Sequence, residues 1–177
     1  MGKDEVDVGR RRFLTGFFGR FREGFDADAP VAASSAAAGT LASANEAFAR
    51  GEHEAASESY RTFLAAESGN REARLRLGIC QYKLGRHVQA KVEFERVLRE
   101  KKGKDNEASL YLGLTLCAAG RPEKAVAVLK LFFDPKAVHT QRELNLQVAL
   151  LESGETPPPD EIVAAVERAV ALDKTLA

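Results

Sequence analysis

A spacing of 34 residues runs through most of this chain and constrains its fold more than any other feature. Gly51 is followed by Gly85 after 34 residues, by Gly120 after a further 35, and by Gly154 after 34 more. Two further slots recur at fixed distances from these glycines, a small one at Ala56, Ala90 and Ala125 and a large apolar one at Tyr60, Phe94 and Leu129. The extra residue falls in the segment KKGKD, where a loop tolerates insertion. Because sequence periods of this length fold as stacked supersecondary units, the spacing predicts a repeat protein.

Each period predicts a pair of helices separated by one glycine. The glycine ends the first helix because it can adopt a left-handed conformation. The small residue lets the two helices approach closely, and the large residue four positions later lies one turn along the same face. Helix starts are predicted at the N-caps Asn70 and Asp105, at Pro122 in a first turn, and at a capping-box pattern, TQRE, from Thr140 to Glu143.

This arrangement resembles the tetratricopeptide repeat (TPR) family over about residues 37–173. The most similar copy, REARLRLGICQYKLGRHVQAKVEFERVLRE, includes the family's Leu77-Gly78 pair and the small Ala90. The sequence departs from the family pattern at the position where the family has tryptophan, which is occupied here by Thr40, Arg74, Ser109 and Glu143. The resemblance implies an all-α, right-handed solenoid of antiparallel helix pairs. Its copies span about 37–70, 71–104 and 106–139, followed by a degenerate, capping fourth at 140–173.

The resemblance also implies a protein-interaction scaffold whose first helices line a concave groove. The predicted groove residues are Leu41, Asn45, Phe48, Leu75, Ile79, Tyr82, Leu110, Leu114, Leu144, Val148 and Leu151. Because all but Asn45 are apolar or aromatic, we expect an apolar or amphipathic peptide as the partner. A clamp for a C-terminal carboxylate is not expected, since only Asn45 suits one. The alternative is that these side chains pack inside the stack.

Few residues suggest chemistry beyond binding. His53 and His87 share one repeat slot and are interpreted as packing residues, while His139 lies in a loop before a helix with no visible partner. Cys80 and Cys117 lie in apolar helices and are predicted to be buried thiols. We find no nucleophile with a base, no paired carboxylates and no phosphate loop, so we expect no enzyme, metal or cofactor.

Charge and hydropathy exclude two further classes. The 26 basic and 26 acidic side chains balance, which argues against a nucleic-acid binder. No run of about 18 uncharged apolar residues is present, so no membrane-spanning helix is expected. The remaining class of partner is a protein or peptide, and the sequence does not indicate an oligomeric state.

Composition divides the chain into a basic, Phe-rich segment at 1–25, a flexible Ala/Ser/Asp linker at 26–39 and a TPR domain at 40–177. Residues 9–25, GRRRFLTGFFGRFREGF, contain five of the ten phenylalanines. On a helix, one face would be apolar and the other basic, formed by Arg10, Arg11, Arg12, Phe13, Leu14, Phe17, Phe18, Arg20, Phe21, Arg22 and Phe25. Such a helix suits an anionic membrane surface. The alternatives are docking into the protein's own groove, docking onto a partner, or a disordered tail that carries these phenylalanines without a binding role.

We therefore expect a non-catalytic scaffold, adaptor or assembly chaperone in the bacterial cytoplasm, peripheral at the inner membrane. The stretch RRRFL at residues 10–14 resembles a twin-arginine signal, although the apolar run after it is short. This leaves an exported, periplasmic TPR factor for envelope assembly as the alternative. A secretion-type chaperone that holds an extended apolar peptide is a further alternative.

Overall fold

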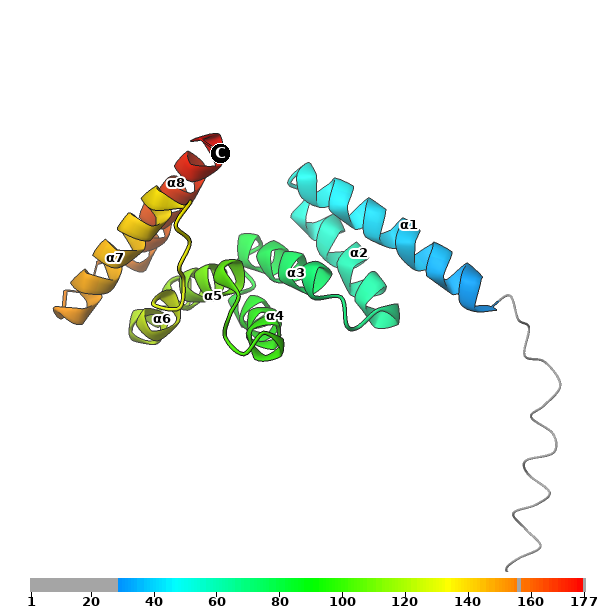
Figure 1. Cartoon of the computed structure of the whole chain (residues 1–177), viewed down its shortest axis with the longest axis horizontal. Coiled ribbons are helices and arrows are strands. Elements are labelled where there is room, and N and C mark those ends of the chain that lie inside the picture. The colour runs from blue at the N-terminus through cyan, green and yellow to red at the C-terminus, as the bar shows by residue number, and fades with distance from the viewer. Residues whose placement is uncertain (1–28, 156, 177) are drawn as a thin grey trace, which may run out of the picture. The chain divides into compact units, whose positions relative to one another are not determined.

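The computed structural model describes residues 29–155 and 157–176, and over these residues it is all-α (Figure 1). Its helices are α1 (Ala29–Ala49), α2 (His53–Ala66), α3 (Arg71–Lys83), α4 (His87–Glu100), α5 (Asn106–Ala118), α6 (Pro122–Leu129), α7 (Val138–Glu152) and α8 (Pro159–Leu176). Contacts divide the chain into one unit at 1–36 and a second at 37–177, and the core described below belongs to the second unit. Consecutive helices pack in pairs, which confirms the predicted all-α repeat fold.

The repeated glycines between helices adopt a left-handed backbone conformation. Gly51, Gly85, Gly120 and Gly154 have φ angles of 75°, 71°, 68° and 86°. An L-residue pays a steric cost in this region that glycine does not. The predicted role of glycine at the end of each first helix is therefore confirmed in all four copies.

Two other glycines permit close approach inside a pair. A Cβ atom on Gly78 would lie 2.6 Å from Cε1 of Phe94, and one on Gly113 would lie 2.1 Å from Cδ2 of Leu129. Phe94 and Leu129 are buried in the same core cluster. The large residue of each second helix therefore packs directly onto the backbone of the first helix.

Three of the predicted helix starts are confirmed. The side chains of Asn70 and Asp105 each accept a hydrogen bond of 2.9 Å from the backbone N–H three residues later, and α6 begins at Pro122. These side chains satisfy N–H groups that would otherwise lack a partner within the helix. The cap sequences therefore locate the second and third pairs.

The predicted capping box at Thr140–Glu143 is wrong. Helix α7 begins earlier, at Val138, so Thr140 lies inside its first turn. The N–H groups there donate to Asp173 of α8, at 3.1 Å from His139 and 2.8 Å from Thr140. A carboxylate from the partner helix takes the capping role, and no local pattern predicts it.

The predicted linker at 26–39 is also wrong over most of its length, because α1 begins at Ala29. The stretch is rich in alanine, which has the highest helix propensity of all residues. Small residues suit either a linker or a helix, and composition alone does not separate the two. The segment at 1–25, with the predicted membrane or partner helix, lies outside the described residues.

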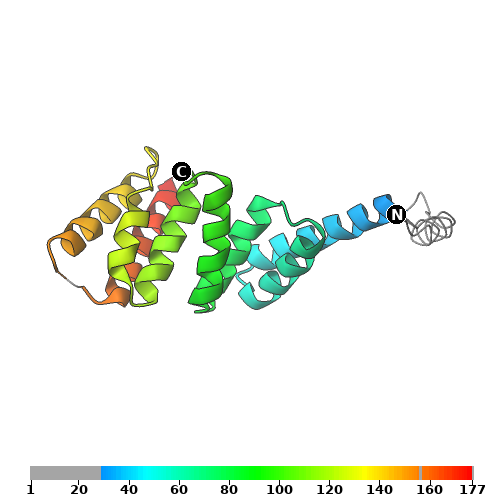
Figure 2. The ribbon, with the colours of Figure 1, turned by 90° about the horizontal axis from the view of Figure 1, so that it is seen from below.

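The last pair departs from the repeat. Helix α5 packs against α3, α4, α6 and α8, whereas α7 packs against α6 and α8. Figure 2 shows α8, in red, partly hidden behind α5 and α6. The second helix of the fourth copy thus lies along α5, where a regular repeat would place a first helix.

Candidate peptide-binding site

The central helices α3 and α5 are buried on nearly all sides. Every residue from Ala108 to Cys117 is buried, and so is every residue from Ala73 to Tyr82 except Arg76. Helix α5 is mostly apolar around its circumference, which is typical of a helix that neighbours surround, whereas α3 also buries the polar Arg74 and Gln81. The groove face of these helices is therefore covered within the chain itself.

Helix α8 covers α5 and holds the end of α3. Ile162 and Val166 are fully buried and belong to the same core cluster as Leu110 and Leu114. Glu167 Oε1 accepts hydrogen bonds from the Tyr82 hydroxyl group at 2.9 Å and from Lys83 Nζ at 2.7 Å. The C-terminal helix thus occupies the inner face that a partner would use in an open stack.

Seven of the predicted groove residues consequently lie in the core. Less than a tenth of each is exposed in Leu75, Ile79, Tyr82, Leu110, Leu114, Leu144 and Val148. The other four are partly exposed, namely Leu41, Asn45, Phe48 and Leu151. The seven do not form an open groove; they pack within the stack because α8 and the neighbouring helices cover them.

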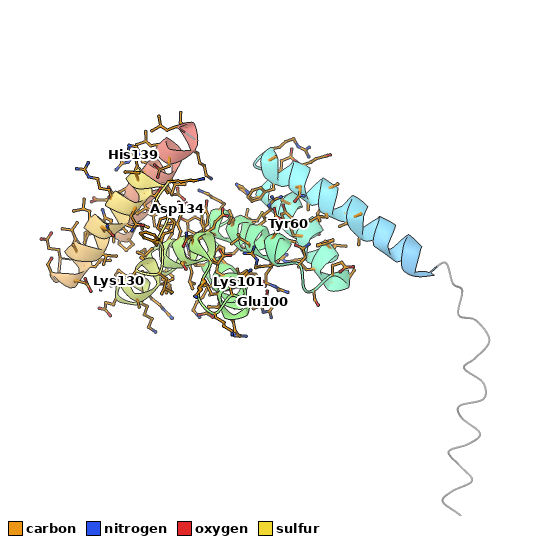
Figure 3. The ribbon with its side chains drawn as sticks, in the orientation of Figure 1. Tyr60, Glu100, Lys101, Lys130, Asp134 and His139 are labelled. Carbon is orange, nitrogen blue, oxygen red and sulfur yellow. The ribbon has the colours of Figure 1, made fainter. Side chains whose placement is uncertain are left out.

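Asn45, the polar groove residue, ties the first two copies together. Its Oδ1 atom accepts hydrogen bonds from the Tyr60 hydroxyl group at 2.8 Å and from Arg76 Nη1 at 2.7 Å (Tyr60 is labelled in Figure 3). The Arg76 guanidinium group also lies 5.8 Å from the centre of the Phe48 ring. Asn45 thus has a structural role that the sequence pattern did not indicate.

A pocket lies next to the groove face of α5, between α5, the α6–α7 loop, the start of α7 and α8. Its volume is about 390 Å³, near the lower end for ligand pockets. Its apolar wall comprises Leu110, Tyr111, Phe132, Ala137 and Val170, and its polar rim comprises Asn106, Glu107, Asp134, Lys136, Thr140, Asp173 and Lys174. Of the predicted groove residues, Leu110 is the one that lines it.

The rim of this pocket carries charged side chains, whereas the hydroxyl group of Tyr111 in its apolar wall is uncharged. Although Glu107 remains exposed as a residue, loss of water around its carboxylate raises its pKa, and the charge of Lys174 opposes that shift. Burial raises the pKa of Tyr111 to about 12, so its hydroxyl group stays protonated at neutral pH. An apolar wall with charges of both signs around it suits one apolar side chain of a peptide.

Comparison with known families agrees with the repeat geometry. Residues 47–105 match the tetratricopeptide repeat family model, from the end of α1 to the start of α5. Over this segment the chain is similar to the tetratricopeptide repeat (TPR) family. Searches of curated proteins and of solved structures found no match. TPR domains generally mediate protein–protein interaction and are typically non-catalytic.

In this chain the paired histidines pack against aromatic rings. The His53 ring lies 6.2 Å from the Phe48 ring, and the His87 ring lies 6.4 Å from the Tyr82 ring. The two contacts are one repeat apart and join the end of a first helix to the start of its partner. The packing role predicted for both histidines is confirmed.

The remaining candidate groups are structural as well. Cys80 and Cys117 are fully buried, as predicted, and burial raises the pKa of each thiol to about 11. His139 does have a partner, contrary to the prediction, because its Nδ1 atom lies 2.8 Å from Asp173 Oδ1. The two residues are 34 positions apart, and only the packing of α8 on α7 brings them together.

Over residues 29–155 and 157–176, no three His, Cys, Asp or Glu side chains are grouped so that they could hold a metal ion. None of the helices in the same ranges is both long and apolar enough to cross a membrane.

The sequence interpretation missed the part of the pocket that α8 and the α6–α7 loop supply. The family pattern places its groove on the first helix of each copy. The pocket also includes Val170, Asp173 and Phe132, which do not belong to any first helix. The sequence does carry one signal, since SLYLGLTLC at residues 109–117 contains no charged residue and has apolar side chains around most of the helix. A helix of that kind requires a cover on each side.

Proposed function

We propose that this TPR protein is a non-catalytic interaction scaffold, working as an adaptor or assembly chaperone. It binds an apolar or amphipathic peptide whose anchor residue enters the pocket beside α5. The observation that carries this proposal is the apolar wall formed by Leu110, Tyr111 and Val170 within a charged rim, on a stack whose central helices are otherwise covered.

The size and chemistry of the pocket favour a single anchor. A volume of about 390 Å³ accommodates side chains rather than a whole helix. Binding energy at protein interfaces is concentrated in a few buried apolar or aromatic residues, with polar contacts around them. Glu107 and Lys174 on the rim offer those polar contacts to the peptide on either side of its anchor.

Residues 10–25 supply a second contact in this proposal, with an anionic membrane or with a partner. The support is the sequence, which places arginines opposite phenylalanines on a helix. The wild-type chain should sediment with phosphatidylserine vesicles, whereas a variant with Phe13, Phe17 and Phe21 changed to serine should stay in the supernatant. Equal sedimentation of both chains would contradict the membrane contact.

We propose a bacterial cytoplasmic location at the inner membrane. The RRRFL stretch at residues 10–14 favours export to the periplasm as the alternative. N-terminal sequencing of the protein from its native cells separates the two, because an intact N-terminus excludes cleavage after export.

Selection of a randomised 12-residue peptide library on the full chain tests the pocket. We expect enriched peptides with a shared apolar anchor, and affinities that fall about tenfold or more in Val170→Asp, since a charge then enters the apolar wall. The matched control is Val88→Asp on α4, where the side chain is 75% exposed. Circular dichroism melting would verify that both variants fold. No enrichment, or equal loss in the two variants, would contradict the proposal.

A further inference from the structure

Two departures from the 34-residue repeat meet at one edge of the domain. The α4–α5 loop contains the extra residue of the third copy. Helix α6 has 8 residues whereas α2 and α4 have 14 each, so the chain leaves the helix early, after Leu129. The loops that result, 101–105 and 130–133, together line a hollow of about 780 Å³.

The first loop gives this hollow a positive charge. Lys101, Lys102 and Lys104 are exposed, and none of the three forms an ion pair with any residue that the structure describes. The other two cations of the lining are neutralised, since Arg71 pairs with Asp105 and Lys130 pairs with Glu152. Figure 3 labels Lys101 and Lys130. Three uncompensated charges are thus gathered here on a chain whose formal net charge is zero.

The backbone of this loop also favours a role for its lysines. Lys102 has a φ angle of 51°, and it is the one non-glycine residue in the described chain with a positive φ. This conformation carries a steric cost for an L-residue, which glycine would avoid. A lysine nevertheless occupies the position, next to Gly103 with φ of 78°.

The second loop presents apolar side chains beside these charges. Phe133 is 70% exposed and Leu131 is 50% exposed, whereas Phe132 between them is buried. Asn106 fixes the backbone at Phe133, because its Nδ2 atom donates to the Phe133 carbonyl at 2.6 Å and its Oδ1 atom accepts from the Phe133 N–H at 3.3 Å. The exposed ring is therefore held on an anchored backbone, at the rim of the hollow.

We propose that this hollow docks an acidic segment of a partner protein that carries an apolar anchor residue. Carboxylates of the segment pair with Lys101, Lys102 and Lys104, and the anchor packs against Leu131 and Phe133. Charge complementarity selects the acidic segment, and exposed apolar side chains gain from burial against it. The concave form favours a polypeptide over a bilayer, since a flat lipid surface would not fill it. The hollow adjoins the pocket beside α5 and shares Asn106 with it, but the lysines, Leu131 and Phe133 belong to the hollow alone.

Fluorescence anisotropy with the full chain and a labelled probe tests this proposal. The probe is a 12-residue peptide of Asp and Glu with Phe and Leu at its centre, and the control probe replaces each acid by Lys. We expect the acidic probe alone to bind, with an affinity that falls as salt rises. Changing Lys101, Lys102 and Lys104 to alanine should weaken it about tenfold, because each exposed pair contributes a factor of about 2 to 5. Phe133→Ser should weaken it by a similar factor.

Matched variants separate this surface from others on the chain. Lys124→Ala on α6 and Leu146→Ser on α7 replace an exposed cation and an exposed apolar side chain on helices that do not line the hollow, and both should bind like the wild type. Val170→Asp should also leave the acidic probe unaffected, so failure of the α5 pocket and failure of this surface are distinguishable. The arginines at residues 10–22 are present in the wild type and in every variant, so any binding of the acidic probe to them is the same in all the chains compared.

Two results would overturn the proposal. The first is that the acidic probe does not bind, or that it binds the lysine variant and the Phe133 variant with the affinity of the wild type. The second is unchanged peptide affinity together with reduced sedimentation of the same variants on phosphatidylserine vesicles. That second result would mean that the surface faces a bilayer.

Discussion

The hydroxyl group of Tyr82 on α3 lies 2.9 Å from Glu167 Oε1 on α8, across 85 positions of sequence. Lys83 Nζ donates to the same carboxylate oxygen at 2.7 Å. Burial raises the pKa of Tyr82, and the Glu167 carboxylate raises it further, so the hydroxyl group remains a donor at all physiological pH values. This contact joins the C-terminal helix to the second copy and helps to keep the central helices covered.

We predict that Glu167→Ala destabilises the domain by about 1–3 kcal/mol, because the buried Tyr82 hydroxyl group loses its acceptor. Urea unfolding followed by circular dichroism measures the change. The control is Glu95→Ala on α4, which removes an exposed pair with Lys91 and should cost about 0.5 kcal/mol or less. A cost for Glu167→Ala no larger than that of the control would show that the contact does not hold α8.

Gly78→Ala and Gly113→Ala should each destabilise the protein by at least about 1 kcal/mol. An added Cβ atom would overlap Phe94 or Leu129, and overpacking of this kind outweighs the gain of about 1 kcal/mol in helix propensity. Gly69→Ala is the control, because an added Cβ there meets nothing within 4 Å. Thermal unfolding of the three variants measures the difference, and a stabilised Gly113→Ala variant would contradict the packing described.

Asp173 should make stability depend on pH in the acid range. Partial desolvation opposes ionisation of its carboxylate, but hydrogen bonds from Thr140 and His139 outweigh it and hold its pKa well below the usual range. A lowered pKa contributes stability above the unfolded-state value of about 3.9, and that contribution is lost as pH falls through the acid range. The wild type should therefore have a higher melting temperature than Asp173→Asn at neutral pH. This gap between the two melting temperatures should narrow as the pH is lowered. A gap that is constant with pH would contradict this assignment.

Neither cysteine should react with a thiol reagent in the folded protein. Cys80 and Cys117 are fully buried, and their pKa values of about 11 leave almost no thiolate at about pH 8. Absorbance with Ellman's reagent should show no reaction in buffer and two thiols in denaturant. Rapid reaction of either thiol in buffer would indicate that its helix opens locally.

The sequence predicts the repeat well because each repeat rule is local. The glycines that end first helices and the caps at Asn70 and Asp105 depend on neighbours in sequence or on the repeat spacing. Local patterns and the observed backbone agree at these positions. The prediction of helix pairs therefore needed no information on long-range contacts.

The site could not be predicted in the same way, because distant contacts decide it. The family pattern places Leu110 and Leu114 on a groove, but α8 packs on α5 there through Ile162 and Val166. No residue of α8 signals this position in sequence, and its length of 18 residues would suit an ordinary repeat helix as well. The Ala-rich start of α1 was misjudged for a related reason, since composition fits both a linker and a helix.

Methyl NMR of the full chain, titrated with a peptide selected from the library, locates the surface that binds the peptide. We predict that the methyl signals of Val170 and Leu110 shift first and most, because their side chains line the pocket that takes the anchor. Shifts confined to Leu41 and Leu151, with Val170 and Leu110 unchanged, would contradict it and place the peptide on the partly exposed groove positions instead.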